Sequence, residues 1–257
     1  MRIVVKVGTS TLAHPGGRLN IRNVEELVKI LADLKNAGHE IILVSSGAIG
    51  MGIGKLNMDR AHMDMPAKQA AAAVGQCELM HTYDTLFLKY SHTVGQILIT
   101  SEDIEDPERK HNFENTMKTL LDFGALPVVN ENDTVATTEI NSVGDNDTLG
   151  AIVAKAIDAD ILVLMSDIDG LYTSDPYKDP SARLIETVEE ITKEIEAFAG
   201  GPESGLGTGG MTTKIGAAQM VTETGCDMVI INGNKPEQLY DIVEGKAAGT
   251  LFKGKRK

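Results

Sequence analysis

The chain has 257 residues, with 24 Lys or Arg against 37 Asp or Glu, and therefore a formal net charge of −13. This length corresponds to roughly one large domain or two small ones, and a globule of this size needs no disulfide or structural metal. The acidic excess argues against a protein that binds nucleic acid through a basic surface. The longest purely apolar runs have five residues, whereas a membrane span takes about 20.

Cysteine usage and the N-terminus indicate the compartment. Cys77 and Cys226 are the only cysteines, they lie far apart, and neither belongs to a C-x-x-C motif. The N-terminal segment MRIVVK carries charge too early for a signal peptide. We therefore expect a cytoplasmic protein that binds neither nucleic acid nor membranes.

Short apolar strands alternate with amphipathic helices along the whole chain. We expect strands at 2–7, 40–45, 94–99, 125–130, 161–165, 228–232 and 250–252. Helices are expected at about 21–37, 66–90, 107–122, 148–157, 189–198, 211–224 and 236–244, with a short helix after the second strand and a hairpin over 167–180. Asn20 is the expected N-cap of the first of these helices, and Gly75 is expected to weaken the helix at 66–90.

This alternation predicts an α/β fold, a three-layer α/β/α sandwich with a mostly parallel central sheet. In such sheets ligands bind beyond the carboxyl ends of the strands. Polar residues follow four predicted strands, in the segments KVGTS, SSGA, NEND and SD, and two further loop segments, GDND and GLGTGGMTTK, contain chemically useful groups. We expect the functional site where these segments meet.

Lys6 stands inside an apolar strand, directly before the loop that starts at Gly8. Glycine allows backbone N–H groups to approach an anion closely, and the lysine adds a positive charge. The segment thus favours an anion site. The alternative is that Lys6 points outward at the end of the strand and extends its ammonium group into water.

The segment 205–214 is a glycine-rich loop that runs into a predicted helix, with Lys214 in the first turns. A helix N-terminus combines free N–H donors with a positive dipole, which suits phosphate. The glycine spacing also satisfies G-x-G-x-x-G, but a helix rather than a strand precedes it, so it does not predict a dinucleotide site. The alternative is a flexible surface loop.

Each remaining polar candidate has a purely structural alternative. Asp147 can cap the helix that follows it, and Ser46 can cap the short helix after the second strand. Asp133 and Asn146 can form Asx turns, and Asp167 can end a turn. Their joint position at strand ends nevertheless favours a shared site.

Taken in order, VVKVGTS, VSSGAIG, AAVGQ, NENDTVAT, VGDND, SDIDGLYTSDP, GLGTGGMTTK and GTLF resemble the amino acid kinase family over nearly the whole chain. NENDTVAT, VGDND and GTGGMTTK resemble the members that phosphorylate glutamate. Many of those members carry a C-terminal PUA domain, whereas this chain ends just after GTLF. In this the chain departs from the family pattern, and we expect a single amino acid kinase domain over 1–257, without a C-terminal PUA domain.

The resemblance implies ATP-dependent phosphorylation of the side-chain carboxylate of L-glutamate to γ-glutamyl phosphate, the first step of proline biosynthesis. It assigns Lys6 and Lys214 to the transferred phosphoryl group and Asp147 to holding these lysines. It assigns Ser46, Asp133 and Asn146 to glutamate, with Asp133 facing the ammonium group and the other two donating to carboxylates. The ATP site would comprise Lys6, Ser166, Asp167, Thr208, Gly209, Gly210, Met211, Thr212, Thr213 and Lys214. Mg²⁺ would arrive with ATP, without a metal site on the protein.

The same resemblance implies proline as a feedback inhibitor, a homodimer or homotetramer, and a functional link to glutamyl phosphate reductase. Three alternatives remain at this stage. A kinase for another small acceptor is disfavoured by NENDTVAT and VGDND, and a catalytically silent amino-acid sensor by the presence of Lys6, Lys214 and Asp147. An RNA-binding module is disfavoured by the charge of −13.

Overall fold

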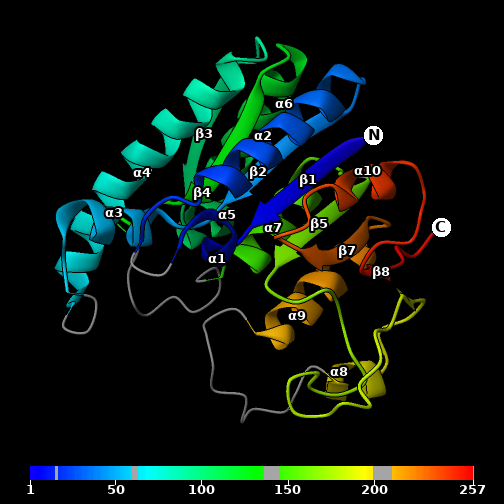
Figure 1. Cartoon of the computed structure of the whole chain (residues 1–257). Coiled ribbons are helices and arrows are strands. Elements are labelled where there is room, and N and C mark those ends of the chain that lie inside the picture. Colours follow the sequence, from blue (N-terminus) through cyan, green and yellow to red (C-terminus); the bar gives the residue numbers. More distant parts are fainter. Residues whose placement is uncertain (15–16, 60–62, 136–144, 199–209, 257) are drawn as a thin grey trace.

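A central sheet of eight strands organises the molecule, in the order β3-β4-β2-β1-β5-β7-β8-β6 (Figure 1). The computed structural model describes residues 1–14, 17–59, 63–135, 145–198 and 210–256. The strands are β1 Arg2–Val7, β2 Glu40–Ser45, β3 Val94–Ile99, β4 Leu126–Glu131, β5 Ile161–Ser166, β6 Thr187–Val188, β7 Asp227–Asn232 and β8 Thr250–Phe252. All neighbouring pairs run parallel except β7 and β8.

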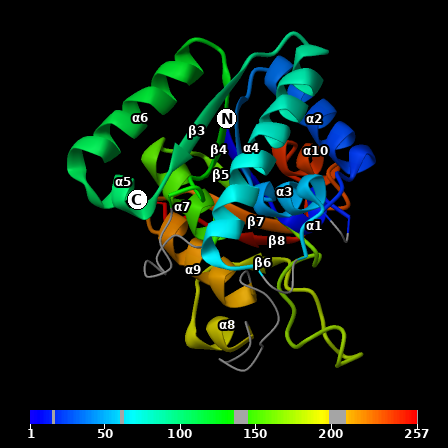
Figure 2. The same ribbon diagram turned by 90° about the vertical axis from the view of Figure 1, so that its left-hand side faces the viewer.

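Helices cover both faces of the sheet, as the continuously apolar strands require. They are α1 Thr9–Leu12, α2 Ile21–Asn36, α3 Ala48–Leu56, α4 Met65–Leu88, α5 Ser101–Glu105, α6 Pro107–Asp122, α7 Asn146–Ala156, α8 Lys193–Phe198, α9 Met211–Thr222 and α10 Gln238–Val243. Buried side chains of α6, α7 and α9 pack on one face, and those of α2, α4 and α10 on the other. Figure 2 shows α6 and α4 on opposite sides of β3. The predicted α/β/α sandwich is confirmed.

The chain reverses its direction of winding at β1. One neighbour of β1 is β2, the next strand in sequence, and the other is β5, which follows much later. Connections that leave a strand toward opposite sides open a crevice at the carboxyl ends, which is where α/β proteins place their ligands. The fold therefore locates the site beyond the ends of β1, β2, β4 and β5.

Two features of the chain after β5 differ from the expectation. The hairpin predicted over 167–180 closes further along, at an antiparallel bridge between Tyr172 and Leu184. The helix predicted over 189–198 begins only at Lys193, because the chain has just left β6, which pairs with β8, and residues 189–192 connect the two elements. Most of the predicted glycine-rich loop at 200–210 lies outside the described residues.

The predicted helix caps are partly confirmed. The Asn20 side chain accepts a hydrogen bond from Asn23 N at the start of α2, as expected. At α7 the structural alternative for Asp147 is wrong, because Asp145 is the N-cap and accepts from the backbone N–H of Asp147. At α3 the N-cap is Gly47, in a left-handed conformation, and not Ser46. Asp147 and Ser46 therefore have no role as N-caps.

Gly75 does not interrupt α4, which is continuous from Met65 to Leu88. Its missing side chain instead allows α3 and α4 to touch, because a Cβ at Gly75 would lie 1.7 Å from Ala48 O. Gly52 on α3 makes the reciprocal approach, with its Cβ position 1.8 Å from Ala71 O. This contact seats α4 beside the start of α3, at the carboxyl end of β2.

Among the described residues, no helix has the length and apolar character that a bilayer span demands.

We predict that Gly75→Ala lowers the free energy of unfolding by about 1–3 kcal/mol, because the new methyl group would force α3 and α4 apart. Gly216→Ala is the matched control. Gly216 is an exposed residue of α9, and no described atom lies within 4 Å of its Cβ position. That variant is expected to gain a few tenths of a kcal/mol from its higher helix propensity. Urea unfolding measures both, and equal stabilities would contradict the packing role of Gly75.

Candidate active site

Lys6 is buried beneath a helix rather than extended into solvent. Ile3, Val5 and Val7 point to the face covered by α2 and α4, whereas Lys6 shares the opposite face with Val4. That face is covered by α7, and a Cβ at Gly150 of α7 would lie 3.4 Å from Lys6 Cβ. The outward alternative is therefore wrong: the residue is only 7% exposed.

A buried carboxylate joins the two lysines. Lys6 Nζ lies 2.6 Å from Asp147 Oδ1, and Lys214 Nζ donates a 2.9 Å hydrogen bond to Asp147 Oδ2. Asp147 is fully buried. Burial alone would raise the pKa of Asp147, but the ammonium groups of Lys6 and Lys214 outweigh it and hold the pKa below its usual value. Asp147 is therefore ionised.

This ion cluster carries an excess of positive charge, since one carboxylate faces two ammonium groups. The three residues come from β1, α7 and α9, so the packing of both helices on the sheet holds the cluster together. Both lysines also line a cleft of about 770 Å³ beyond the strand ends. A positive charge in a partly desolvated position favours an anionic ligand there.

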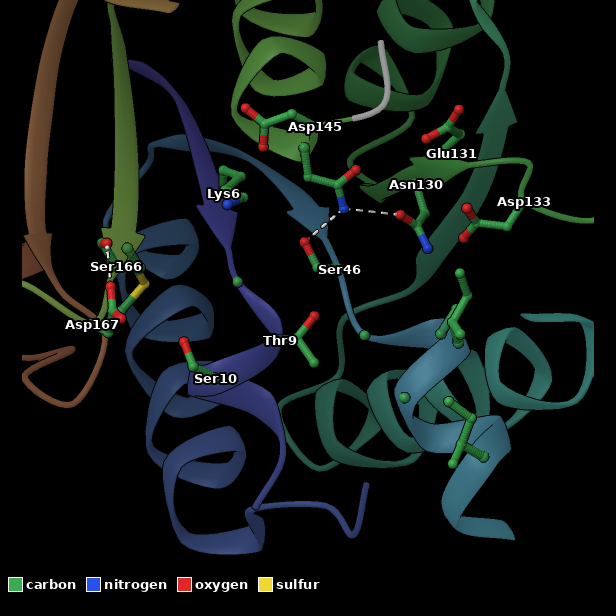
Figure 3. Close-up of a pocket in the computed structure, with 18 of the residues that line it drawn as sticks. Lys6, Thr9, Ser10, Ser46, Asn130, Glu131, Asp133, Asp145, Ser166 and Asp167 are labelled. Atoms are coloured by element: carbon green, nitrogen blue, oxygen red, sulfur yellow. Dashed lines mark hydrogen bonds between the residues drawn. The ribbon is translucent and has the colours of Figure 1, made fainter. Parts of the chain in front are cut away.

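The cleft has two arms on either side of Lys6 (Figure 3). One arm contains Ser166 and Asp167 at the end of β5, where Ser166 Oγ donates a 3.0 Å hydrogen bond to Asp167. The other arm contains Ser46 after β2, and Asn130 and Asp133 at the end of β4. The two arms give room for two ligands that meet at the lysines.

The amide of Asn146 lies at the centre of the second arm. Its Nδ2 donates to Ser46 Oγ at 2.6 Å, to Ser45 O at 3.2 Å and to Asn130 Oδ1 at 3.2 Å. We expected this nitrogen to donate to a ligand carboxylate, but it is already engaged within the protein. What Asn146 offers the cleft is its side-chain oxygen.

Acidic side chains surround the same arm. Burial raises the pKa of Asp133 to about 6. Burial, followed by the neighbouring Asp133, also raises the pKa of Glu131. For Asp145 the pKa is raised by burial and by the charge of Asp147. Asp145 interacts with Lys6 and Thr213 at the ion cluster, so it is the desolvated carboxyl groups of Asp133 and Glu131 that favour a cationic group on the ligand in this arm.

The donor set does not match a metal site built from protein side chains. Within the described ranges, no group of three or more His, Cys, Asp or Glu residues has the arrangement to hold a metal ion. Both oxygens of Asp147 face lysines. Mg²⁺ prefers phosphate oxygens and water to carboxylates that are already paired with lysines. The arrival of Mg²⁺ together with a nucleotide stays a prediction.

The structure brings most of the predicted site residues together. Seven of them line the cleft, namely Lys6, Ser46, Asp133, Asn146, Ser166, Asp167 and Lys214. Asp147 lies beneath Lys6 and Lys214, and Gly210 precedes Met211, Thr212 and Thr213 in the first turn of α9. Of these, Thr213 Oγ1 lies within 3.3 Å of Asp147 Oδ2. Thr208 and Gly209 lie outside the described residues.

Several polar residues of the site were not selected from the sequence. They include Lys68 and Gln76 on α4, Asn130 at the end of β4, and Asp145 before α7. Asn130 and Asp145 stand within segments that were recognised as strand-end or loop motifs. Gln76 stands in AAVGQ, a segment used only for the resemblance. Lys68 has no sequence signal, because nothing nearby marks the start of α4 as part of a site.

Comparison with known proteins places this geometry in context. The sequence model described as the amino acid kinase family matches residues 1–232. The chain is 55% identical to the glutamate 5-kinase of Clostridium acetobutylicum, over 100% of this chain and 96% of that protein. It is 48% identical to the glutamate 5-kinase of Listeria monocytogenes, over 99% of this chain and 94% of that protein.

Solved structures match at much lower identity. A carbamate kinase from Giardia lamblia bound to AMP-PNP has a TM-score of 0.70 at 16% identity, covering 98% of both chains. An isopentenyl phosphate kinase from T. acidophilum has a TM-score of 0.64 at 16% identity, covering 98% of this chain and 100% of that one. At such identity these matches establish the fold alone.

We predict that Asp133→Asn stabilises the free protein above pH 6, because the ionised carboxylate is desolvated in the native state. The raised pKa means that native Asp133 keeps its proton up to about pH 6, whereas the unfolded residue loses it near pH 4. The advantage of the variant is therefore full above pH 6, shrinks as the pH falls, and vanishes below about pH 4. Paired urea unfolding of both proteins from pH 4 to 8 measures the difference, and a constant difference would contradict it.

Proposed function

The chain belongs to the amino acid kinase family, and we propose that it transfers the γ-phosphoryl group of ATP to the side-chain carboxylate of L-glutamate. The product is γ-glutamyl phosphate, which makes the reaction the first step of proline biosynthesis. The single observation that carries the proposal is the buried Lys6–Asp147–Lys214 cluster at the junction of two cleft arms. The identity to curated glutamate 5-kinases supports it over nearly the full length.

Transfer between two anions is an electrostatic problem. The glutamate side chain has a reference pKa of about 4.3, so it is already ionised at pH 7 and needs no general base. The obstacle is its approach to a polyanionic triphosphate. Lys6 and Lys214 stabilise the negative charge of the phosphoryl group in transit, and Asp147 keeps their ammonium groups in place.

The two arms divide the ligands. ATP occupies the arm of Ser166 and Asp167, with its phosphates toward Gly210 at the start of α9, where unpaired N–H groups and the helix dipole attract anions. Glutamate occupies the arm of Ser46, Asp133 and Asn146, with its ammonium group toward Asp133. Held in this way, donor and acceptor meet at the lysines, which removes much of the entropic cost of the encounter. Mg²⁺ bound to the phosphates of ATP would neutralise part of their charge, next to Lys6 and Lys214.

The resemblance supports further proposals about regulation and context. They are inhibition by proline, assembly into a homodimer or homotetramer, a functional link to glutamyl phosphate reductase, and a cytoplasmic location. Proline shares an α-carboxylate and an ammonium group with glutamate, so the acidic arm offers it the same charge complementarity.

The proposed reaction predicts ADP release that depends on glutamate. A coupled assay with ATP and Mg²⁺ should respond to glutamate and respond far less to aspartate, acetylglutamate or carbamate. Millimolar proline should reduce the rate. Equal rates with and without glutamate would overturn the proposed function, whereas a response to glutamate that ignores proline would remove only the inhibitor.

We predict that Lys214→Met lowers kcat by about 10²–10³-fold with little change in KM for glutamate, because its ammonium group acts on the transferring phosphoryl group. The methionine keeps the length of the side chain, and Lys6 still neutralises Asp147. Lys253→Met is the matched control, since it removes an exposed ion pair with Glu189 that lies outside the cleft. Steady-state kinetics distinguish the two, and near-normal turnover of Lys214→Met would exclude a catalytic role for this lysine.

A further inference from the structure

We infer that Gln76 is a positioning residue for the acceptor substrate: by holding the amide of Asn130, it stabilises the orientation in which Asn146 and Ser46 face the cleft. Gln76 lies on α4, is 7% exposed, and does not itself line the cleft. It acts at the far end of a chain of side-chain amides that starts at the substrate arm. The inference rests on the proposed function and deepens it.

One backbone group determines the direction of the chain of amides. Ser45 O is a carbonyl oxygen and can only accept hydrogen bonds. Asn146 must therefore turn its nitrogen toward Ser45, at 3.2 Å. The same nitrogen faces Asn130 at 3.2 Å, so Asn130 must present its oxygen there. Two of the dashed lines of Figure 3 mark the hydrogen bonds from Asn146 to Ser46 and to Asn130.

The direction then propagates to α4. With its oxygen toward Asn146, Asn130 turns its nitrogen away and needs an acceptor. Gln76 Oε1 provides it, at 2.9 Å from Asn130 Nδ2 in a buried contact. Asn130 is 2% exposed, so water does not readily replace that acceptor. Gln76 Nε2 is buried and makes no hydrogen bond within the described part of the chain. The side-chain amide of Gln76 therefore acts through its oxygen.

The consequence for a ligand is a defined pattern of donors and acceptors. Asn146 has two N–H hydrogens for three neighbouring acceptors, so only its oxygen remains to accept a bond from the ligand. Ser46 Oγ already accepts from Asn146, so its hydrogen is available to donate. An ammonium group fits the oxygen of Asn146, and a carboxylate fits the hydroxyl of Ser46. The arrangement selects an amino acid over a simple dicarboxylate.

Replacing Gln76 by Met tests this directly, since Met fills similar space but removes the acceptor. Asn130 then satisfies its nitrogen elsewhere by turning its amide, which places a donor against Asn146 and disturbs the acceptor pattern. We expect KM for glutamate to rise about tenfold or more, while kcat at saturating glutamate and KM for ATP change less than about threefold. The inhibition constant of glutarate, which lacks the ammonium group, should change far less than KM for glutamate.

Two further variants separate positioning from general damage to α4. Gln76→Glu presents an oxygen to Asn130 whichever way its carboxyl group lies, and should restore most of the affinity for glutamate. Thr82→Val removes a hydroxyl that bonds within the same helix, to Glu78 O at 2.9 Å, and should leave KM unchanged. Thermal unfolding confirms that each variant is folded at the assay temperature.

The outcomes of these experiments distinguish a failure of the inference about Gln76 from a failure of the proposed function on which it rests. Wild-type protein without glutamate-dependent ADP release would overturn the proposed function itself. An active wild type with an unchanged KM in Gln76→Met would overturn the inference alone. So would an equal loss of affinity for glutamate and glutarate, or a loss in Gln76→Glu as large as in Gln76→Met, since a merely structural role predicts both.

Discussion

The contact on which the rest of the site depends is the carboxylate of Asp147 between two buried ammonium groups. A buried ion without a partner costs several kcal/mol, so each lysine requires Asp147, and Asp147 requires at least one of the lysines. Lys6 and Lys214 are remote in sequence and reach Asp147 only because α7 and α9 pack side by side on the face of β1 that carries Lys6. The packing of α7 and α9 on the sheet therefore determines the positive charge of the cleft.

This packing explains how a protein with a net charge of −13 can attract a polyanion. Charges on the exposed surface are screened over about 8 Å at physiological ionic strength, so most of the acidic residues act weakly at the cleft. The two lysines act at short range and in a less polar medium, where the same charge has a larger effect. The position of two positive charges matters more here than the sum of all charges.

The sequence was sufficient for the layers of the fold, because apolar strands and helical periodicity record burial directly. It was insufficient where the answer depended on packing partners. Alternation placed Lys6 opposite Val5 and Val7, but only the position of Gly150 on α7 shows that this face is covered. The segment GDND contains two acids next to a helix start, and its pattern does not say which one caps the helix. Gln76 stands in an alanine-rich helix whose face toward Asn130 is decided by the approach of α3 to Gly75.

The proposed phosphoryl end and acceptor end of the site depend on different interactions. The phosphoryl end depends on net charge, which falls off gradually with distance and tolerates small movements of a lysine. The acceptor end depends on the direction of hydrogen bonds, which weaken steeply when an amide turns. Gly75 seats α4 against α3, and the next residue, Gln76, terminates the chain of amides. A change in helix packing at this point therefore acts first on recognition of the acceptor and only later on the chemistry of transfer. On the proposed function, the selectivity of the site for its acceptor thus depends on the contact between α3 and α4 behind the substrate arm.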